Sequence, residues 1–255
     1  MKTILLIAGL DPTAGAGLLA DARVAADHGV RAVGVATALT LQDTRGVRAV
    51  KPTARPLLAD QLRLLLDDLR AVDAVKIGML GNRALAAIVA QTLRSVRAPI
   101  VWDPVLKPSR GRVPLFAGSP RAAVRELLAL ARLVVPNRAE AEALTGVRVD
   151  SLDGMRRAAA ALRAAGAAAV LVKGGHLPGA RAIDILDDGG AVTEFAARRV
   201  DAGDLHGTGC VLSTAIACEL AAGASLADAV RSAKAYLTVR LRRPIAVGKG
   251  ARTLV

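Results

Sequence analysis

Short apolar runs of strand length alternate along this chain with longer segments in which apolar residues recur at helical spacing. Nearly continuous apolar runs of this kind are typical of parallel strands that are buried on both faces. The predicted strands are residues 1–9, 31–40, 74–77, 99–102, 133–135 and 168–172. The predicted helices are residues 18–28, 56–69, 82–94, a segment that begins at 119–120, 137–146 and 151–165. The alternation predicts an α/β fold with a mainly parallel central sheet.

The last third of the chain follows a different pattern. Residues 182–196 predict an antiparallel hairpin that turns at residues 188–190, an Asp-Gly-Gly sequence. A glycine-bearing turn then leads into an apolar helix within residues 204–222, and a last helix is expected over 225–242. Because neither a linker nor a repeat interrupts the pattern, we expect residues 1–255 to form one domain.

The residues that directly follow the predicted strands are mostly polar. They are Asp11, Gln42, Met79, Asp103, Asn137 and Lys173. Ligands of open parallel sheets bind beyond the carboxyl ends of the strands, so we expect these side chains to line one site. Two carboxylates, an amide and a lysine suit phosphoryl transfer, which needs a metal held by acids and cationic stabilisation of phosphate charge.

The turn at Asp204-Leu-His-Gly-Thr-Gly-Cys210 is the segment with the most specific chemistry. Gly207 and Gly209 flank Thr208, and glycines let consecutive backbone N–H groups point one way at the start of a helix, which favours an anion. Cys210 would lie at the positive helix end, where we expect its pKa to fall below about 8.5. The pattern indicates a pocket for a transferring phosphoryl group. A glycine turn with a small buried cysteine is the alternative from these residues alone.

The other polar candidates also have purely structural interpretations. Asn137 and Glu140 have the spacing of an N-cap and its capping-box partner. Asp103 precedes a proline and Lys173 precedes two glycines, as turn residues do. His206 fits a hydrogen-bonded loop residue better than a base. The chain contains no Gly-x-x-x-x-Gly-Lys-Ser/Thr motif, which excludes a P-loop protein.

Composition adds few constraints. Hydrophobic residues make up 53% of the chain and aromatic residues 2%, so the core must be built from Leu, Val, Ile and Ala. The net charge of +13 would suit a nucleic-acid partner. However, the arginines are scattered and stacking aromatics are nearly absent, so we favour a solvated basic surface and expect no nucleic-acid partner.

The lengths of the apolar runs and the positions of the cysteines indicate the cellular location of the protein. No apolar run is long enough for a transmembrane helix. The apolar run at the start is short and leads into Asp11-Pro12 rather than a cleavage site, so we interpret it as a first strand and expect a cytoplasmic protein. Cys210 and Cys218 are eight residues apart on one predicted helix, roughly 12 Å, which is too far for a disulfide.

Seven sequence blocks stand out in order along nearly the whole chain. They are Ala8-Gly-Leu-Asp-Pro-Thr-Ala-Gly-Ala-Gly-Leu-Leu-Ala-Asp21, Leu41-Gln-Asp-Thr-Arg-Gly-Val47, Lys76-Ile-Gly-Met-Leu80, Asp103-Pro-Val105, Pro136-Asn-Arg-Ala-Glu-Ala141, Val172-Lys-Gly-Gly-His176 and His206-Gly-Thr-Gly-Cys210. Together they resemble the hydroxymethylpyrimidine/phosphomethylpyrimidine kinases of thiamine biosynthesis, in the ribokinase-like superfamily. The cysteine after Gly-Thr-Gly is the discriminating residue, since sugar kinases carry aspartate there. The resemblance implies a three-layer α/β/α sandwich.

The resemblance also implies roles at the substrate end of the site. Cys210 would activate the substrate hydroxyl beside an anion hole made by the Gly-Thr-Gly backbone. Gln42 would hydrogen-bond the aminopyrimidine edge, because an amide donates and accepts at once. The residues that would line the pyrimidine pocket are Asp21, Met79 and Val105. The implied substrates are 4-amino-5-hydroxymethyl-2-methylpyrimidine and its monophosphate.

At the nucleotide end the resemblance implies ATP and Mg²⁺. Asp103 and Glu140, with Asn137, would hold Mg²⁺ through oxygen ligands and water. Lys173 and Thr208 would contact the phosphates of ATP. A homodimer is implied by the family alone.

Some residues depart from the family pattern. Ala14 stands where a second glycine is usual, and Asp43 where asparagine is usual. After Asp103-Pro-Val the family usually has an apolar pair and Lys-Ser-Gly, whereas this chain reads Leu106-Lys-Pro-Ser-Arg-Gly111, which brings Lys107 and Arg110 into the segment 105–118. A pyridoxal kinase, or an enzyme with both activities, is the nearest alternative. An inactive regulatory protein that has kept the fold is a further one.

Overall fold

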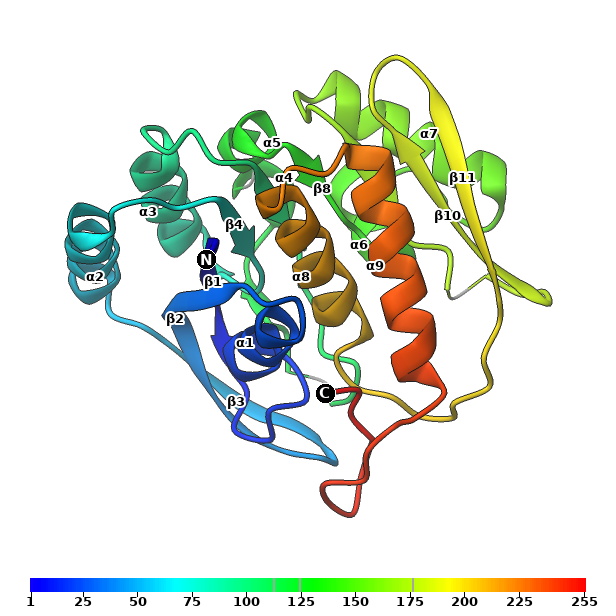
Figure 1. The fold of residues 1–255 in the computed structure, drawn as a ribbon, viewed down its shortest axis with the longest axis horizontal. Helices are drawn as coiled ribbons and strands as arrows, with labels where there is room; N and C mark the ends of the chain where they lie inside the picture. Colours follow the sequence, from blue (N-terminus) through cyan, green and yellow to red (C-terminus); the bar gives the residue numbers. More distant parts are fainter. Residues whose placement is uncertain (112, 124, 176) are drawn as a thin grey trace.

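The computed structural model describes residues 1–111, 113–123, 125–175 and 177–255, which form a nine-stranded sheet with helices on both faces (Figure 1). In chain order the elements are β1 (Thr3–Leu10), α1 (Gly17–Asp27), β2 (Arg31–Asp43), β3 (Gly46–Pro52), α2 (Arg55–Asp68), β4 (Ala74–Ile77), β5 (Gly81–Asn82), α3 (Arg83–Leu93), β6 (Ile100–Trp102), β7 (Phe116–Ala117), α4 (Pro120–Ala123), α5 (Arg125–Leu130), β8 (Leu133–Val134), α6 (Arg138–Thr145), α7 (Leu152–Ala164), β9 (Val170–Val172), β10 (Arg181–Asp187), β11 (Val192–Arg198), α8 (Thr208–Ala221) and α9 (Leu226–Leu241).

The sheet is mainly parallel, as the sequence predicts. Its strand order is β11-β10-β9-β8-β6-β4-β1-β2-β3. The strands from β9 to β2 in this order pair in parallel, while β3, β10 and β11 pair antiparallel at the two edges. Since the parallel strands all point the same way, their carboxyl ends meet at one edge of the sheet.

The interior strand β1 shows why its apolar run is continuous. Ile4 and Leu6 belong to the core on one face of the sheet, whereas Leu5 and Ile7 belong to the core on the other. Successive side chains of a strand point to opposite faces, so a strand with both faces covered needs apolar residues at every position. In Figure 1, α1, α8 and α9 cover one face, and α2, α3 and α7 lie on the other. The three-layer α/β/α sandwich is confirmed.

The predicted helix ends are confirmed by their capping contacts. The Asn82 side chain accepts a hydrogen bond from the Leu85 N–H at 3.0 Å and so begins α3. Ser151 and Ser225 cap α7 and α9 in the same way. Gly146 ends α6 in the left-handed conformation that favours glycine. The hairpin of β10 and β11 is also confirmed.

One prediction about the backbone is wrong. The strand predicted over residues 31–40 instead extends to Asp43, as β2, and pairs antiparallel with β3. The expectation failed because this hairpin leaves the buried part of the sheet and lacks a continuous apolar run. Its signal is the alternation of Leu39 and Leu41, which are 54% and 64% exposed, with the polar residues Thr40 and Gln42. The hairpin carries Gln42 to the active edge of the sheet.

Two smaller features complete the fold. β5 and β7 form a separate two-stranded sheet that the sequence did not predict. The helix expected from residue 119 is observed over Pro120–Ala123 (α4) and Arg125–Leu130 (α5), the residues described on either side of position 124. His176, the last residue of one sequence block, lies outside the described residues. Among the residues that the structure describes, no helix is both long and apolar enough to span a membrane.

Candidate active site

A cavity of about 890 Å³ lies at the carboxyl ends of the parallel strands. Residues that follow five strands line it: Asp11 after β1, Met79 after β4, Asp103 after β6, Asn137 after β8 and Lys173 after β9. The start of α8 forms another wall. The prediction that the side chains at the strand ends gather in one place is therefore confirmed.

Nearly all of the predicted site residues line this cavity. They are Gln42, Met79, Asp103, Val105, Asn137, Glu140, Lys173, Gly207, Thr208, Gly209 and Cys210. The exception is Asp21, which was expected to line the pyrimidine pocket. It is fully buried, and its carboxylate accepts hydrogen bonds from Lys76 Nζ at 2.6 Å and from Thr214 Oγ1 at 2.7 Å. Asp21 therefore contacts Lys76, which lines the cavity, but does not line the cavity itself.

Lys76 is the lining residue that sequence reasoning missed. It lies on β4, whose other residues are apolar, and its side chain is buried yet borders the cavity. A buried ammonium needs a partner, and Asp21 on α1 supplies it. The available signal was a charged residue within a four-residue strand, together with an aspartate on the buried face of α1. Within the pair, the Lys76 ammonium favours the thiolate of Cys210, whereas the Asp21 carboxylate disfavours it.

The Gly-Thr-Gly turn depends on two close backbone approaches. Gly207 has φ +87°, and a Cβ placed there would lie 1.8 Å from the carbonyl oxygen of Gly15. A Cβ on Gly209 would lie 3.1 Å from Lys173 Nζ and 3.2 Å from an Asp103 oxygen. Glycine is therefore required for the first turn of α8 to reach both the N-terminal loop and the Asp103–Lys173 pair. The first-turn N–H groups, which have no partner within the helix, lie beside that pair.

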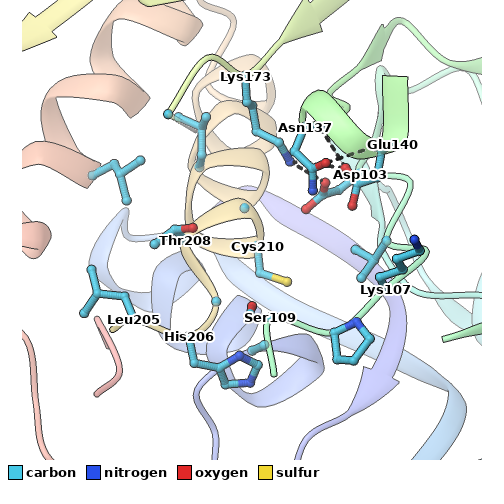
Figure 2. A pocket seen from close by; sticks show the side chains of 18 of the residues that line it. Asp103, Lys107, Ser109, Asn137, Glu140, Lys173, Leu205, His206, Thr208 and Cys210 are labelled. Atoms are coloured by element: carbon cyan, nitrogen blue, oxygen red, sulfur yellow. Dashed lines mark hydrogen bonds and ion pairs between the residues drawn. The ribbon is translucent and has the colours of Figure 1, made fainter. Parts of the chain in front are cut away.

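Cys210 is on this first turn, and Figure 2 shows its sulfur directed into the cavity. Burial raises the pKa of its thiol to about 11, although the positive charge of Lys76 and the Gly17 N–H oppose this rise. The prediction that the helix end lowers this pKa is wrong. The side chain is only 9% exposed, so loss of water outweighs the helix dipole and the lysine. In the free protein Cys210 is a neutral thiol at pH 7.

This raised pKa predicts slow alkylation. At pH 8 iodoacetamide should label Cys210 at about a thousandth of its limiting rate, because only the thiolate reacts and three pH units separate pH 8 from the pKa. The rate should increase about tenfold per pH unit up to pH 10. Mass spectrometry of the labelled peptide measures it, and a Cys210→Ser variant corrects for Cys218. A rate that levels off below pH 8 would contradict the burial argument.

Asp103, Lys173 and Glu140 form a charged cluster beside Cys210 (Figure 2). Lys173 Nζ lies 2.7 Å from Asp103 Oδ1 and 4.0 Å from Glu140 Oε2. Asn137 and Glu140 do form the capping box that was considered as an alternative, with hydrogen bonds of 3.0 and 2.7 Å. Burial raises the pKa of Glu140 to about 7, although Lys173 opposes this rise.

The oxygen atoms of this cluster fit Mg²⁺. No group of three or more acidic, histidine or cysteine side chains within the described residues could hold a metal ion on its own. Mg²⁺, however, is usually held by one or two carboxylates together with substrate phosphates and several waters. Asp103 and Glu140 supply two buried carboxylates at the cavity wall, so the donor set matches this mode of binding.

A second polar network lies at the substrate end. His206 Nε2 lies 2.8 Å from Asp11 Oδ2, and the side-chain amide of Gln42 lies 3.0 Å from the same ring nitrogen. The interpretation of His206 as a hydrogen-bonded loop residue is confirmed. Met79 and Val105 belong to a small apolar cluster that borders this end of the cavity.

The segment after β6 covers part of the cavity. Lys107, Pro108 and Ser109 line it. Arg110 forms an ion pair with Asp204, at the start of the Gly-Thr-Gly turn. The departure of this segment from the family pattern therefore places a charged residue where it contacts the start of the Gly-Thr-Gly turn.

Comparisons with known proteins agree with this geometry. Residues 11–254 match the phosphomethylpyrimidine kinase family. The hydroxymethylpyrimidine/phosphomethylpyrimidine kinase of Rhizobium meliloti (strain 1021) is 42% identical over 251 residues, covering 96% of this chain and 94% of the relative. The protein of the same description from Streptomyces coelicolor is 42% identical over 248 residues, covering 97% of this chain and 91% of the relative.

Solved structures give the same picture. The pyridoxal kinase from Staphylococcus aureus in complex with AMP-PCP superposes with a TM-score of 0.90 at 28% identity, covering 99% of this chain and 92% of that one. The phosphomethylpyrimidine kinase from Clostridium difficile 630 has a TM-score of 0.81 at 32% identity, covering 94% of this chain and 99% of that one.

Fold and cavity together define a ribokinase-like kinase, a phosphotransferase built on an α/β/α sandwich. Within that class, the chain belongs to the phosphomethylpyrimidine kinase family. The resemblance carried by the seven sequence blocks is confirmed.

Proposed function

We propose that this protein transfers the γ-phosphoryl group of ATP to 4-amino-5-hydroxymethyl-2-methylpyrimidine and then to the resulting monophosphate, in thiamine biosynthesis. One observation carries the proposal. Cys210, at the start of α8, opens into the same cavity as an amide that can read a heteroaromatic edge and a carboxylate–lysine cluster that suits phosphates. Seven matching sequence blocks and the family membership support it.

At the substrate end, Gln42 would bind the pyrimidine edge while Met79 and Val105 contact the ring. These apolar side chains lie beside Gln42 on the cavity wall. The hydroxymethyl oxygen would then face Cys210. Asp21 takes no part in this contact, since it is buried behind Lys76.

At the phosphate end, Lys173 and the first-turn N–H groups of α8, including that of Thr208, would stabilise charge on the transferring group. Asp103 and Glu140, with Asn137 beside them, would hold Mg²⁺, which neutralises charge on the phosphate oxygens when bound. Gly209 supports this assignment, because its missing side chain lets the helix start approach the Asp103–Lys173 pair.

In the first reaction the substrate oxygen forms a bond to the γ-phosphorus while the bond to the β-phosphate oxygen breaks and ADP leaves. The hydroxyl proton passes to the Cys210 thiolate, a minor form that the Lys76 charge favours. In the second reaction the attacking oxygen belongs to a phosphate that is already ionised, so it needs no base. It needs neutralisation of two neighbouring anions, which Lys173 and the helix start provide.

The substrate assignment of Gln42 makes a separate prediction. Gln42→Ala should raise the KM for the pyrimidine about fivefold or more and leave the KM for ATP unchanged, since a buried amide hydrogen bond contributes roughly 1 kcal/mol. Steady-state kinetics with each substrate varied in turn measures both constants. If both KM values changed together, the amide would not be a substrate contact.

A coupled assay of ADP release against a panel of pyrimidine and pyridine alcohols tests the function itself. We expect turnover of the pyrimidine and of its monophosphate, with the diphosphate as final product on anion exchange. Pyridoxal is the second candidate substrate, because pyridoxal kinases are among the similar structures. Turnover of pyridoxal without turnover of the pyrimidine would reject the proposal in favour of a salvage kinase.

The remaining parts of the proposal rest on the sequence pattern, except the homodimer, which rests on family resemblance. We propose that residues 1–255 act as one kinase domain, that the enzyme is a cytoplasmic homodimer and that it binds no nucleic acid. Size-exclusion chromatography with light scattering tests the homodimer, and a retention assay with DNA and RNA tests the last point.

A further inference from the structure

The protonation of His206 follows from its neighbours. Asp11 accepts hydrogen bonds from the Thr13 N–H at 2.9 Å, the Thr13 hydroxyl at 2.8 Å and the Ala16 N–H at 3.0 Å. Burial alone would raise the pKa of Asp11, but these bonds and that of His206 hold it below its ordinary value. Asp11 is therefore an ionised acceptor at neutral pH. His206 Nε2, at 2.8 Å from it, must carry a proton and donate.

The His206 ring is also fixed in position. A Cβ on Gly15 would lie 2.7 Å from the ring atom Cδ2, so the N-terminal loop packs directly against the ring. The backbone N–H of His206 donates to the Arg252 carbonyl oxygen at 2.9 Å. Because ring and backbone are both held, the Nε2–H bond points in a fixed direction.

The amide of Gln42 meets this N–H. The amide nitrogen and His206 Nε2 lie 3.0 Å apart, which would set two donors against each other. Rotating the amide by half a turn puts its carbonyl oxygen in the place of that nitrogen. The His206 Nε2–H then donates to both this oxygen and the Asp11 carboxylate. The NH₂ group then points away from His206, and the oxygen keeps one free lone pair.

We propose that His206, held by Asp11, is a positioning residue that fixes the orientation of the Gln42 amide and thereby selects the substrate edge. This inference rests on the proposed function. The Gln42 amide would donate a hydrogen bond to an unprotonated ring nitrogen of the substrate and accept one from the neighbouring exocyclic amine. The site would bind heteroaromatic alcohols that present a ring nitrogen as hydrogen-bond acceptor next to an amine as donor. It would reject alcohols with the reverse order, in which a ring N–H donor lies next to a carbonyl acceptor.

Two compounds of nearly equal shape separate these cases. The aminopyrimidine alcohol carries the matching edge, and 5-hydroxymethyl-2-methylpyrimidin-4(3H)-one carries the reverse edge. Wild type should prefer the amino compound by about a thousandfold or more in kcat/KM, since sites built for hydrogen bonds discriminate strongly against mismatched partners.

The variants test the role of His206. His206→Phe keeps a ring but removes the N–H, so the amide can turn over. The preference should fall at least about tenfold, because the KM for the oxo compound decreases. His206→Gln restores a donor at similar reach and should retain most of the preference. Gln42→Glu offers only acceptors, which match one group of either edge, so it should remove most of the preference. An unchanged preference in His206→Phe, or equal behaviour of the Phe and Gln variants, would overturn the proposal.

A binding-independent readout separates this inference from the proposed function. If wild type phosphorylates neither pyrimidine, the function is wrong, but the amide orientation is still measurable in the free protein. The side-chain NH₂ resonances of Gln42 are assigned by their loss in ¹⁵N-labelled Gln42→Glu. We expect no strong nuclear Overhauser contact between them and the His206 Hε2 proton. A strong contact would place the NH₂ group against the ring and refute the inference.

Discussion

Replacing Cys210 by alanine should lower turnover of the pyrimidine alcohol at least about a hundredfold, because general acid–base help is typically worth that much or more. ATP affinity should remain nearly unchanged, since the anion site is made of backbone N–H groups and Lys173. Single-turnover kinetics and a binding titration with a non-hydrolysable ATP analogue measure the two effects.

Cys218→Ala is the matched control. Cys218 lies on the same helix and is buried, but it does not line the cavity. Its loss should leave turnover within about a factor of two, because the substitution removes only one buried sulfur. Turnover like wild type in Cys210→Ala would remove this residue from the mechanism.

Replacing Lys173 by methionine should reduce kcat/KM for ATP by about a hundredfold to a thousandfold, the range expected when one preorganised donor is lost. Burial alone would lower the pKa of Lys173, but the charges of Asp103 and Glu140 raise it, so the ammonium stays charged. Its removal leaves two buried carboxylates without their partner. The variant should therefore also lose about 3–5 kcal/mol of folding stability.

The double variant Lys173→Met/Asp103→Asn tests the origin of the stability loss. Asparagine removes the unpaired carboxylate that lay nearest the lysine, so chemical denaturation should show much of the lost stability restored. Activity should stay low, because Asp103 is also a proposed Mg²⁺ ligand. A stability no higher than that of the single variant would contradict the ion-pair account.

Much of the site was predictable because it follows from strand ends. Continuous apolar runs such as β1 and β4 indicate buried parallel strands, and parallel strands bring the residues after them to one edge. Asp103, Asn137 and Lys173 therefore met as expected. Their contacts within the cluster, including the capping box, depend only on local spacing and on this shared edge.

Other features could not be predicted because they depend on how deeply a side chain is buried and on contacts with residues far away in the sequence. The pKa of Cys210 is set by burial, which a helix-end argument does not contain. Lys76 and Asp21 look like isolated charges in sequence and become a pair only when α1 packs against the sheet. Gln42 lies beyond the predicted end of its strand because this part of β2 has one exposed side, where Leu39 and Leu41 project.

The contact between Gly15 and Gly207 has a consequence for the order of folding. Every strand of the main sheet ends by Arg198, so the whole sheet can pair before residue 207 leaves the ribosome. The bond between Asp11 and His206 spans 195 residues, and contacts of such separation form late. A nascent chain can thus possess its complete sheet and still lack a catalytic pocket. Substrate and nucleotide can stabilise only the finished protein, and they cannot guide the earlier assembly of the sheet.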